Sequence, residues 1–205
     1  GEVEQVPFDL SAAGLALLVI DTKAEHSLVD GQYGARRAAC EKAARVLGID
    51  LLADIAPDDL EAHLSKLAGP TGCGGDAEGE ADELVKRTRH VVTEIDRTRR
   101  LVALLRDSRP LAGPKLEEVG ALMNASHDSL RDDYECSCPE LDMAVAAARK
   151  AGAHGARMTG GGFGGSAIAL VDADSADAVA RAVVVAYAEA DFTAPAFLNA
   201  IPSAG

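Results

Sequence analysis

The chain has 205 residues, of which 48% are hydrophobic and 26% charged, a composition typical of a globular protein and not of a disordered one. Asp and Glu outnumber Lys and Arg by 33 to 20, which gives a net charge of −13 and argues against nucleic-acid binding, because that requires cationic side chains. No apolar run approaches the ~20 residues that span a bilayer, so we expect no membrane segment.

The N-terminal third predicts two strands followed by two helices. Residues 2–8 alternate loosely and predict a strand, and the aliphatic run at residues 15–20 predicts a second strand, buried on both faces. Residues 33–47 have apolar positions three and four apart, which predicts an amphipathic helix, and Gly48 is placed to cap its C-terminus. Residues 57–67 predict a short helix with Pro57 in its first turn.

The middle of the chain predicts one loop and then helices. Residues 68–80 contain five glycines and few apolar side chains, so too little surface can be buried to offset the entropy of ordering them. We therefore expect a flexible surface loop there. Apolar periodicity then predicts a long helix around residues 91–105, another at about 116–130 and a third at 139–150.

The last third changes character. A glycine-rich segment at residues 160–165 leads directly into an apolar run at 166–171, which predicts a strand. An Ala- and Val-rich helix at 176–190 and a final strand at 196–201 follow. Strands at both ends with helices between them predict an α+β fold, with helices packed on one face of a mostly antiparallel sheet.

The glycine-rich segment satisfies the pattern GxGxxG, but its context does not fit a dinucleotide site. In a Rossmann fold that loop opens a helix, whereas here a strand follows it. A phosphate-binding P-loop requires a Lys that is absent. Glycines allow positive φ angles and close approach of other groups, and their N–H groups can form an anion-binding nest. The glycines alone leave open whether the segment is such a site or a tight structural turn.

The cysteines do not indicate a metal or disulfide framework. Cys136 and Cys138 are separated by one residue, which is too close for the usual zinc spacing, and no His pair follows at the required distance. Cys40 and Cys73 stand apart. Reduced thiols of a cytosolic protein are the expected interpretation.

Charged clusters have structural interpretations as well as chemical ones. Arg36 and Arg37, like the arginines within residues 97–100, fall in helical patterns and are interpreted as solvated helix faces. His127 and the charged residues 131–133 could suggest catalysis, but capping and ion pairing at a helix end explain them better. The same structural interpretation applies to His26 and His90.

Four segments, in the same order along the chain, resemble galactokinases of the GHMP superfamily. Residues 155–168 read GARMTGGGFGGSAI, and residues 126–142 read SHDSLRDDYECSCPELD, with Cys136 where the family usually has Val. Residues 26–40 and 89–95 supply the HSL…Y..RR..C and RHVVTEI segments. The resemblance covers nearly the whole chain.

This resemblance implies that residues 1–205 form the GHMP-kinase C-terminal domain. Galactokinases transfer the γ-phosphoryl group of ATP to the C1 hydroxyl of α-D-galactose, with Mg²⁺. No segment here matches the family's N-terminal sugar-binding motif, its Gly- and Ser-rich ATP loop or its catalytic Asp. We therefore expect that an N-terminal half, which binds most of the ATP and Mg²⁺, is absent and that this chain alone is inactive. A start at Gly1 without Met agrees with that expectation.

The resemblance places Tyr33 at the galactose-binding Tyr of the family, although a Tyr that covers the start of its own helix is the alternative. It also places a loop beside the active cleft, where the loop would shape the pocket. The residues of this loop are Thr159, Gly160, Gly161, Gly162, Phe163, Gly164 and Gly165. We assign no catalytic residue and no metal ligand to this chain.

Three alternatives stay open: another GHMP small-molecule kinase, a galactokinase-like sugar sensor without turnover, and a stand-alone module that uses the glycine loop for an anion or a protein contact. The expected partners are galactose, ATP and the N-terminal half. A homodimer through an exposed surface is a further possibility, and the expected location is the cytoplasm.

Overall fold

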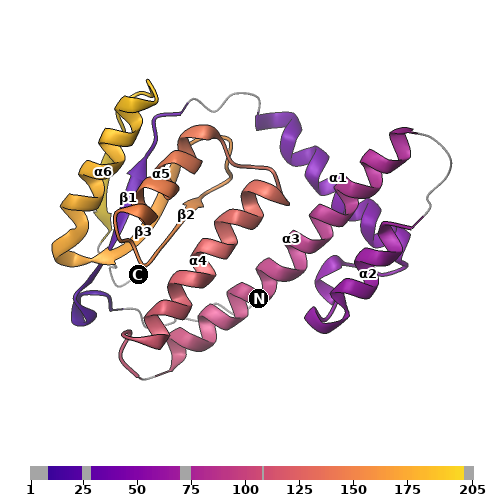
Figure 1. Ribbon diagram of the computed structural model, residues 1–205. Helices are drawn as coiled ribbons and strands as arrows, with labels where there is room; N and C mark the ends of the chain where they lie inside the picture. Colours follow the sequence, from indigo (N-terminus) through magenta and orange to yellow (C-terminus); the bar gives the residue numbers. More distant parts are fainter. Residues whose placement is uncertain (1–8, 25–28, 70–74, 108, 201–205) are drawn as a thin grey trace. The chain divides into compact units, whose positions relative to one another are not determined.

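The computed structural model describes residues 9–24, 29–69, 75–107 and 109–200 (Figure 1). Its contacts divide the chain into two units: unit 1 is Gly1–Ser27, Arg100–His127 and Cys136–Gly205, and unit 2 is Leu28–Arg99 and Asp128–Glu135. The elements are β1 (Leu15–Asp21), α1 (Val29–Leu47), α2 (Leu60–Leu67), α3 (Gly75–Arg106), α4 (Pro114–Asp132), α5 (Pro139–Lys150), β2 (Gly155–Thr159), β3 (Ser166–Asp172), α6 (Ala176–Glu189) and β4 (Ala196–Ala200).

Unit 1 contains an antiparallel sheet of four strands in the order β2-β3-β1-β4. The strand predicted at residues 15–20 is thus confirmed and lies in the interior of the sheet, where Leu18 is opposite Ala169 of β3 and Val19 is opposite Leu198 of β4. The α+β class is confirmed as well.

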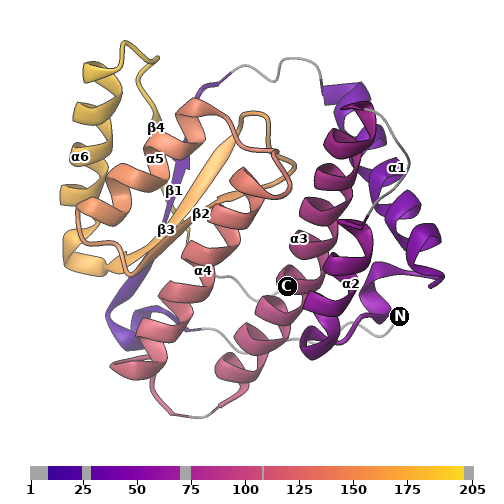
Figure 2. The same cartoon turned by 45° about the vertical axis from the view of Figure 1, so that its right-hand side comes forward.

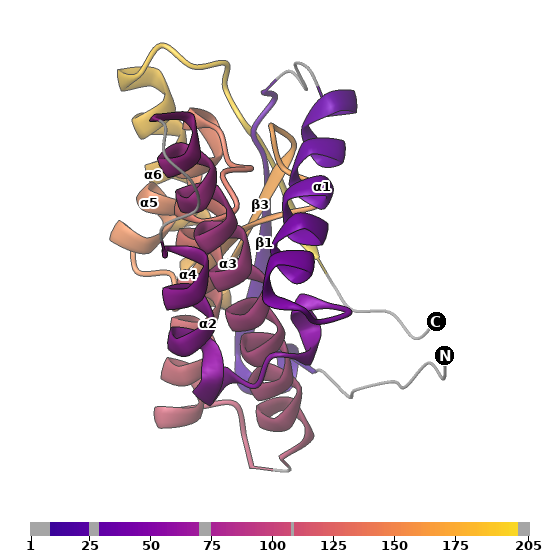
Figure 3. The same cartoon turned by 90° about the vertical axis from the view of Figure 1, so that its right-hand side faces the viewer.

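Two helices pack side by side on one face of this sheet. Helix α5 packs against β2 and β3, and α6 packs against β1 and β3, as Figures 2 and 3 show. Side chains alternate between the faces of a strand, so Leu18 and Ile20 share one face with Ala169 and Val171. All four are buried, which makes this layer a core of small and aliphatic side chains.

The opposite face is covered too, so the prediction that helices lie on one face only was wrong. Leu17 and Leu170 point away from the face that α5 and α6 cover, and they belong to a hydrophobic cluster with Val119 and Met123 of α4. The physical reason is that the run at residues 15–20 is apolar at every position. Both of its faces therefore need apolar neighbours.

The edge strand β2 was not predicted, and side chains of α4 satisfy its outer N–H groups. The N–H of Ala156 donates to Asn124 Oδ1 at 3.0 Å, and the N–H of Met158 donates to His127 Nδ1 at 3.2 Å. Asn124 and His127 lie three residues apart on α4 and therefore on one helix face. Because no Cβ intervenes at Gly120, the helix backbone comes close to the start of β2.

Unit 2 contains α1, α2 and the first part of α3. Helix α1 ends as predicted at Gly48, which has a φ of +72°. The N–H of Gly48 donates to the Arg45 carbonyl, and that of Ile49 to the Ala44 carbonyl, so two terminal carbonyls are satisfied. The buried side chains of this core include Ala39, Ala43, Leu52, Ile55, Leu60, Leu64, Leu67, Leu84 and Val92.

The predicted start of the long helix at residues 91–105 was wrong, because that helix begins much earlier in the chain. Helix α3 begins at Gly75, so residues 75–80 of the predicted loop are helical, while residues 70–74 lie outside the described residues. Extending an existing helix by a turn costs far less than starting one, and Lys42 of α1 pairs with Glu80 there. The strand predicted at residues 2–8 also lies outside the described residues. None of the described helices combines the length and apolarity needed to cross a membrane.

Candidate functional site

The glycine-rich segment connects β2 to β3, so a strand precedes it and a strand follows it. Gly160, Gly162, Gly164 and Gly165 have φ angles of +82°, +86°, +133° and +85°. Such angles are readily adopted only by glycine. Phe163 also has a positive φ, of +59°, which costs a non-glycine residue about 1–3 kcal/mol and must be offset by surrounding contacts.

Two anchors within unit 1 hold this loop. The N–H of Phe163 donates to the Cys136 carbonyl at 2.8 Å. At the last residue of the loop, the Gly165 carbonyl accepts from the N–H of Thr22 at 3.0 Å and from its Oγ1 at 2.6 Å. Thr22 is 1% exposed and directly follows β1. Sequence reasoning missed both anchors; a polar residue directly after a buried strand was the one available signal.

The loop has a buried part and an exposed part. Gly162 and Gly164 are buried, whereas Gly160 and Gly161 are exposed. No acceptor in the described part of the chain binds the N–H groups of Gly160 and Gly161. Neighbouring free N–H groups on such a backbone can bind an anion. The loop is therefore both a closely packed turn and a potential anion site, the two interpretations that the sequence left open.

The contacts of His127 indicate a role in holding the fold together. It is 1% exposed, and its Nδ1 accepts the hydrogen bond from Met158, so a neutral ring carries its proton on Nε2. Nε2 lies 3.3 Å from Asp142 Oδ1, although the two are not aligned for a hydrogen bond. Ser137 Oγ donates to the same carboxylate. These contacts join α4, α5 and β2 and support the structural interpretation of His127.

Asp133 and His90, for which the sequence also favoured a structural interpretation, form an ion pair and a stacking contact in unit 2. Asp133 pairs with Arg89 at 2.9 Å. His90 is buried, lies with its Nδ1 3.0 Å from Ser129 Oγ, and stacks on Tyr134 with ring centroids 4.5 Å apart. His26 lies outside the described residues.

Arg36 is buried, so its interpretation as part of a solvated helix face was wrong. It is 6% exposed, and its guanidinium donates to the backbone carbonyls of Tyr134 (2.7 Å) and Glu135. Its neighbour Arg37 is exposed and pairs with Glu41 at 2.8 Å, as that interpretation expected. Both arginines lie on α1, so the helix pattern alone does not distinguish them. Arg36 is the buried one because the segment at Tyr134 and Glu135 packs over it.

A second buried cation supports the same segment. Arg87 of α3 is 4% exposed and donates to the Asp133 carbonyl and to the Glu135 carboxylate, the latter at 2.7 Å. Partial burial acts to raise the pKa of Glu135, but hydrogen bonds from Arg87 and Lys86 outweigh it, so this pKa is lowered. The backbone carbonyls of residues 133–135 thus accept hydrogen bonds from the buried side chains of Arg36 and Arg87.

Tyr33 lies near the start of α1, in unit 2, whereas the glycine loop lies in unit 1. Its side chain is among the exposed large hydrophobic ones, at 39%. A partly exposed phenol of this kind can contact a sugar through its ring and its hydroxyl.

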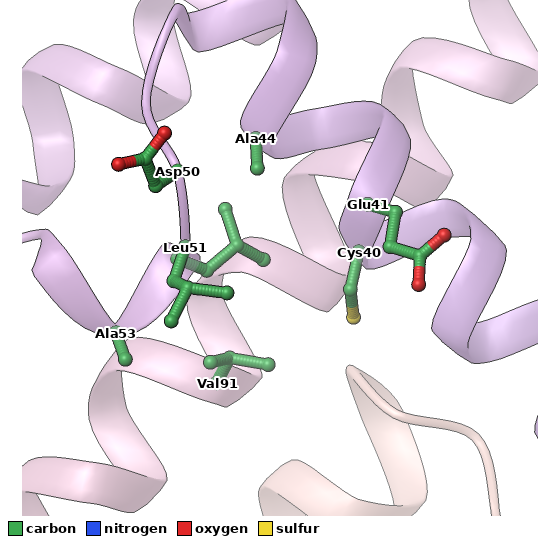
Figure 4. A pocket seen from close by; sticks show the side chains of 8 residues that line it. Cys40, Glu41, Ala44, Asp50, Leu51, Ala53 and Val91 are labelled. Atoms are coloured by element: carbon green, nitrogen blue, oxygen red, sulfur yellow. The ribbon is translucent and has the colours of Figure 1, made fainter.

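Unit 2 also contains an apolar pocket of about 230 Å³ between α1, the turn at residues 50–53 and α3. Figure 4 shows Leu51 and Val91 on the side toward which the Cys40 side chain lies, and the carboxylates of Glu41 and Asp50 pointing away from these side chains. Burial raises the pKa of the Cys40 thiol. The lining lacks the convergent polar groups that orient a ligand, so we assign none to it.

The described residues offer no metal centre: no group of three His, Cys, Asp or Glu side chains is arranged around a common point. Cys40, Cys136 and Cys138 are free thiols, and Cys73 lies outside the described residues.

Comparison with known proteins finds similarity to kinases of small molecules. Residues 101–189 match the family described as GHMP kinases C terminal. The chain is 49% identical to the galactokinase of Streptomyces coelicolor over 98% of its own length and 48% of that protein's, and 41% identical to that of Bos taurus over 91% and 42%. It spans about half the length of the relatives that it matches.

A solved structure has the same fold. Lactococcus lactis galactokinase complexed with galactose superimposes with a TM-score of 0.80 at 32% identity, covering 96% of this chain and 47% of that one.

Proposed function

We propose that this chain is the C-terminal half of a galactokinase, because residues 101–189 match the family of GHMP kinases C terminal and nearly the whole chain is similar to galactokinases. The complete enzyme transfers the γ-phosphoryl group of ATP to the C1 hydroxyl of α-D-galactose. An N-terminal half supplies the ATP-binding loop and the catalytic carboxylate. The location that fits this role is the cytoplasm.

The observation that carries this proposal is the geometry of the glycine loop. Residues 159–165 are held by buried anchors at Phe163 and Gly165, while Gly160 and Gly161 are exposed and their N–H groups have no acceptor in the described part of the chain. Phosphoryl transfer depends on positioning and charge stabilisation, and a fixed loop with free donors suits the edge of a site for an anionic substrate. The loop would shape the pocket and orient groups from the other half.

The described residues fit ATP and Mg²⁺ only in part. The loop can border a phosphate, but no cluster of carboxylates in the described residues can hold a metal ion. When bound, Mg²⁺ neutralises charge on the phosphates. We therefore assign most of the binding of ATP and Mg²⁺ to the N-terminal half, and to this chain the shaping of the pocket.

In this proposal Tyr33 contacts galactose. Its exposure near the start of α1 supports that role, since the ring can cover the apolar face of a sugar. The runner-up function is a galactokinase-like sensor that binds sugar and nucleotide without turnover. Such a sensor would have a similar C-terminal half, so the residues that distinguish a sensor from an enzyme would lie in segments outside this chain.

The test joins this chain to the N-terminal half of its Streptomyces coelicolor relative and follows ATP- and galactose-dependent formation of ADP. The joined protein is expected to turn over, and the 205-residue chain alone is not. Tyr33→Phe should raise the KM for galactose by about tenfold, the effect of losing one hydrogen bond of about 1.4 kcal/mol, with a smaller change in kcat. Arg37→Gln on the same helix is the control.

The outcomes test separate parts of the proposal. Saturable galactose binding without turnover by the joined protein would contradict the proposal that this chain completes a galactokinase. Turnover by the chain alone would contradict the assignment of the catalytic groups to the missing half. A KM that Tyr33→Phe leaves unchanged would show that the Tyr33 hydroxyl makes no hydrogen bond to the sugar, without affecting the rest of the proposal.

A further inference from the structure

The outer side of α5 and α6 forms an apolar groove of about 570 Å³ that the proposed function does not use. Both helices contribute to it residues with the spacing i, i+3, i+4 and i+7. These residues are Met143, Ala146, Ala147 and Lys150 on α5, and Ala182, Val185, Ala186 and Glu189 on α6, with Ala151 at the end of α5.

Each helix already buries a different stripe inside unit 1. Leu141, Ala144, Val145 and Ala148 of α5, and Val179, Val183 and Tyr187 of α6, are buried. A helix at the surface of a protein needs one apolar stripe, toward its own core. The groove is a second stripe on each helix, and it faces outward, where Val185 is 56% exposed. Small side chains with Met and Val between them allow another helix layer to approach closely.

The two helices are antiparallel, and this places opposite charges at the two ends of the groove. Tyr187 near the C-terminus of α6 donates its hydroxyl to the carbonyl of Glu140 in the first turn of α5. Lys150 at the C-terminus of α5 is therefore at one end of the groove, and Glu189 at the C-terminus of α6 is at the other. Both are exposed, and neither forms an ion pair within the described part of the chain.

We propose that this groove is the contact surface of a homodimer. A two-fold axis that lies in the plane of the groove and runs across the helices reverses their direction in the second copy. The Lys150 end of one copy then lies level with the Glu189 end of the other, and the same pair forms again at the opposite end. A surface with opposite charges at its two ends is thus complementary to itself, as an isologous interface requires.

Sedimentation equilibrium of the 205-residue chain, over a range of protein and salt concentrations, tests this proposal. The wild-type chain is expected to dimerise, more weakly at high salt. Lys150→Glu and Glu189→Lys, each alone, should raise the dimer Kd by about tenfold or more, because each places like charges opposite one another at both ends. The double variant K150E/E189K should return the Kd to near the wild-type value, since it exchanges the charges and keeps them complementary.

Arg181→Glu is the matched control, because it reverses an exposed charge on α6 that does not line the groove. It should leave the Kd unchanged. Circular dichroism checks that every variant is folded. A wild-type chain that stays monomeric overturns the proposal, as does a dimer that the single reversals leave intact or that the double variant fails to restore. None of these measurements depends on kinase activity, so failure here would leave the proposed function untouched.

Discussion

The carbonyl oxygen of Cys136 lies where a side chain on Gly162 would have to be: a Cβ there would come within 2.1 Å of it. The same oxygen accepts the N–H of the next residue, Phe163. The backbone of Cys136 thus packs directly against the glycine loop. Gly162 is required for close approach as well as for its φ angle.

Gly160 and Gly162 provide a matched pair that separates these two requirements. Both have a φ near +85°, but a Cβ on Gly160 would meet open space. Gly160→Ala is expected to cost about 1–2 kcal/mol of unfolding free energy, the cost of the left-handed backbone. Gly162→Ala should cost about 2 kcal/mol more, because the contact with Cys136 must also give way. Urea denaturation measures both, and equal losses would contradict the importance of the contact.

Arg36 and Arg37 make a second pair. Arg36→Met removes two hydrogen bonds to backbone carbonyls near Tyr134 and leaves those acceptors without their charged donor, at an expected cost of about 2–4 kcal/mol. Arg37→Met removes one exposed ion pair and should have no measurable effect. Thermal unfolding of the two variants compares them, and a similar loss in both would show that burial of Arg36 adds nothing.

His127 accepts the N–H of Met158 at the edge of the sheet. His127→Leu leaves that buried donor unsatisfied, and the expected loss of stability is about 1–3 kcal/mol. Hydrogen exchange at the Met158 amide should become faster by more than exchange at strand positions inside the sheet. His63→Leu, at an exposed position on α2, is the control. Unchanged exchange at Met158 would argue against this bond.

The Cys138 thiol makes stability depend on pH in the alkaline range. Burial raises its pKa from 9.0 to about 11. Between these values the unfolded chain has lost the proton while the folded chain keeps it, so the folded state binds more protons. Stability is therefore complete below about pH 9 and is lost as the pH rises toward 11.

Cys138→Ser removes this titration, so the difference between wild type and variant isolates it from other alkaline groups such as Tyr187. Urea midpoints measured from pH 8 upward should fall more steeply for wild type than for the variant. Parallel curves would mean that the thiol has the same pKa in both states.

Local signals in the sequence predicted most elements well. Residues 139–150 begin at a Pro and end in basic residues, and the structure has a helix with those bounds. Gly48 ends α1 where expected. The failures fall where neighbours decide the outcome: the alternation in residues 155–159 is too weak to indicate a strand, and this segment becomes β2 because β3 pairs with it and α4 satisfies its outer edge.

The amino-acid sequence by itself determined the fold class, the helices and the segments that resemble galactokinases, because periodicity, caps and motifs are properties of residues near one another in the chain. Only the tertiary structure decided which of two adjacent arginines is buried, which glycine of the loop admits no side chain, and which helix stripes stay uncovered. Those facts depend on groups such as the Cys136 carbonyl, 26 residues before Gly162 in the chain, that only folding brings together.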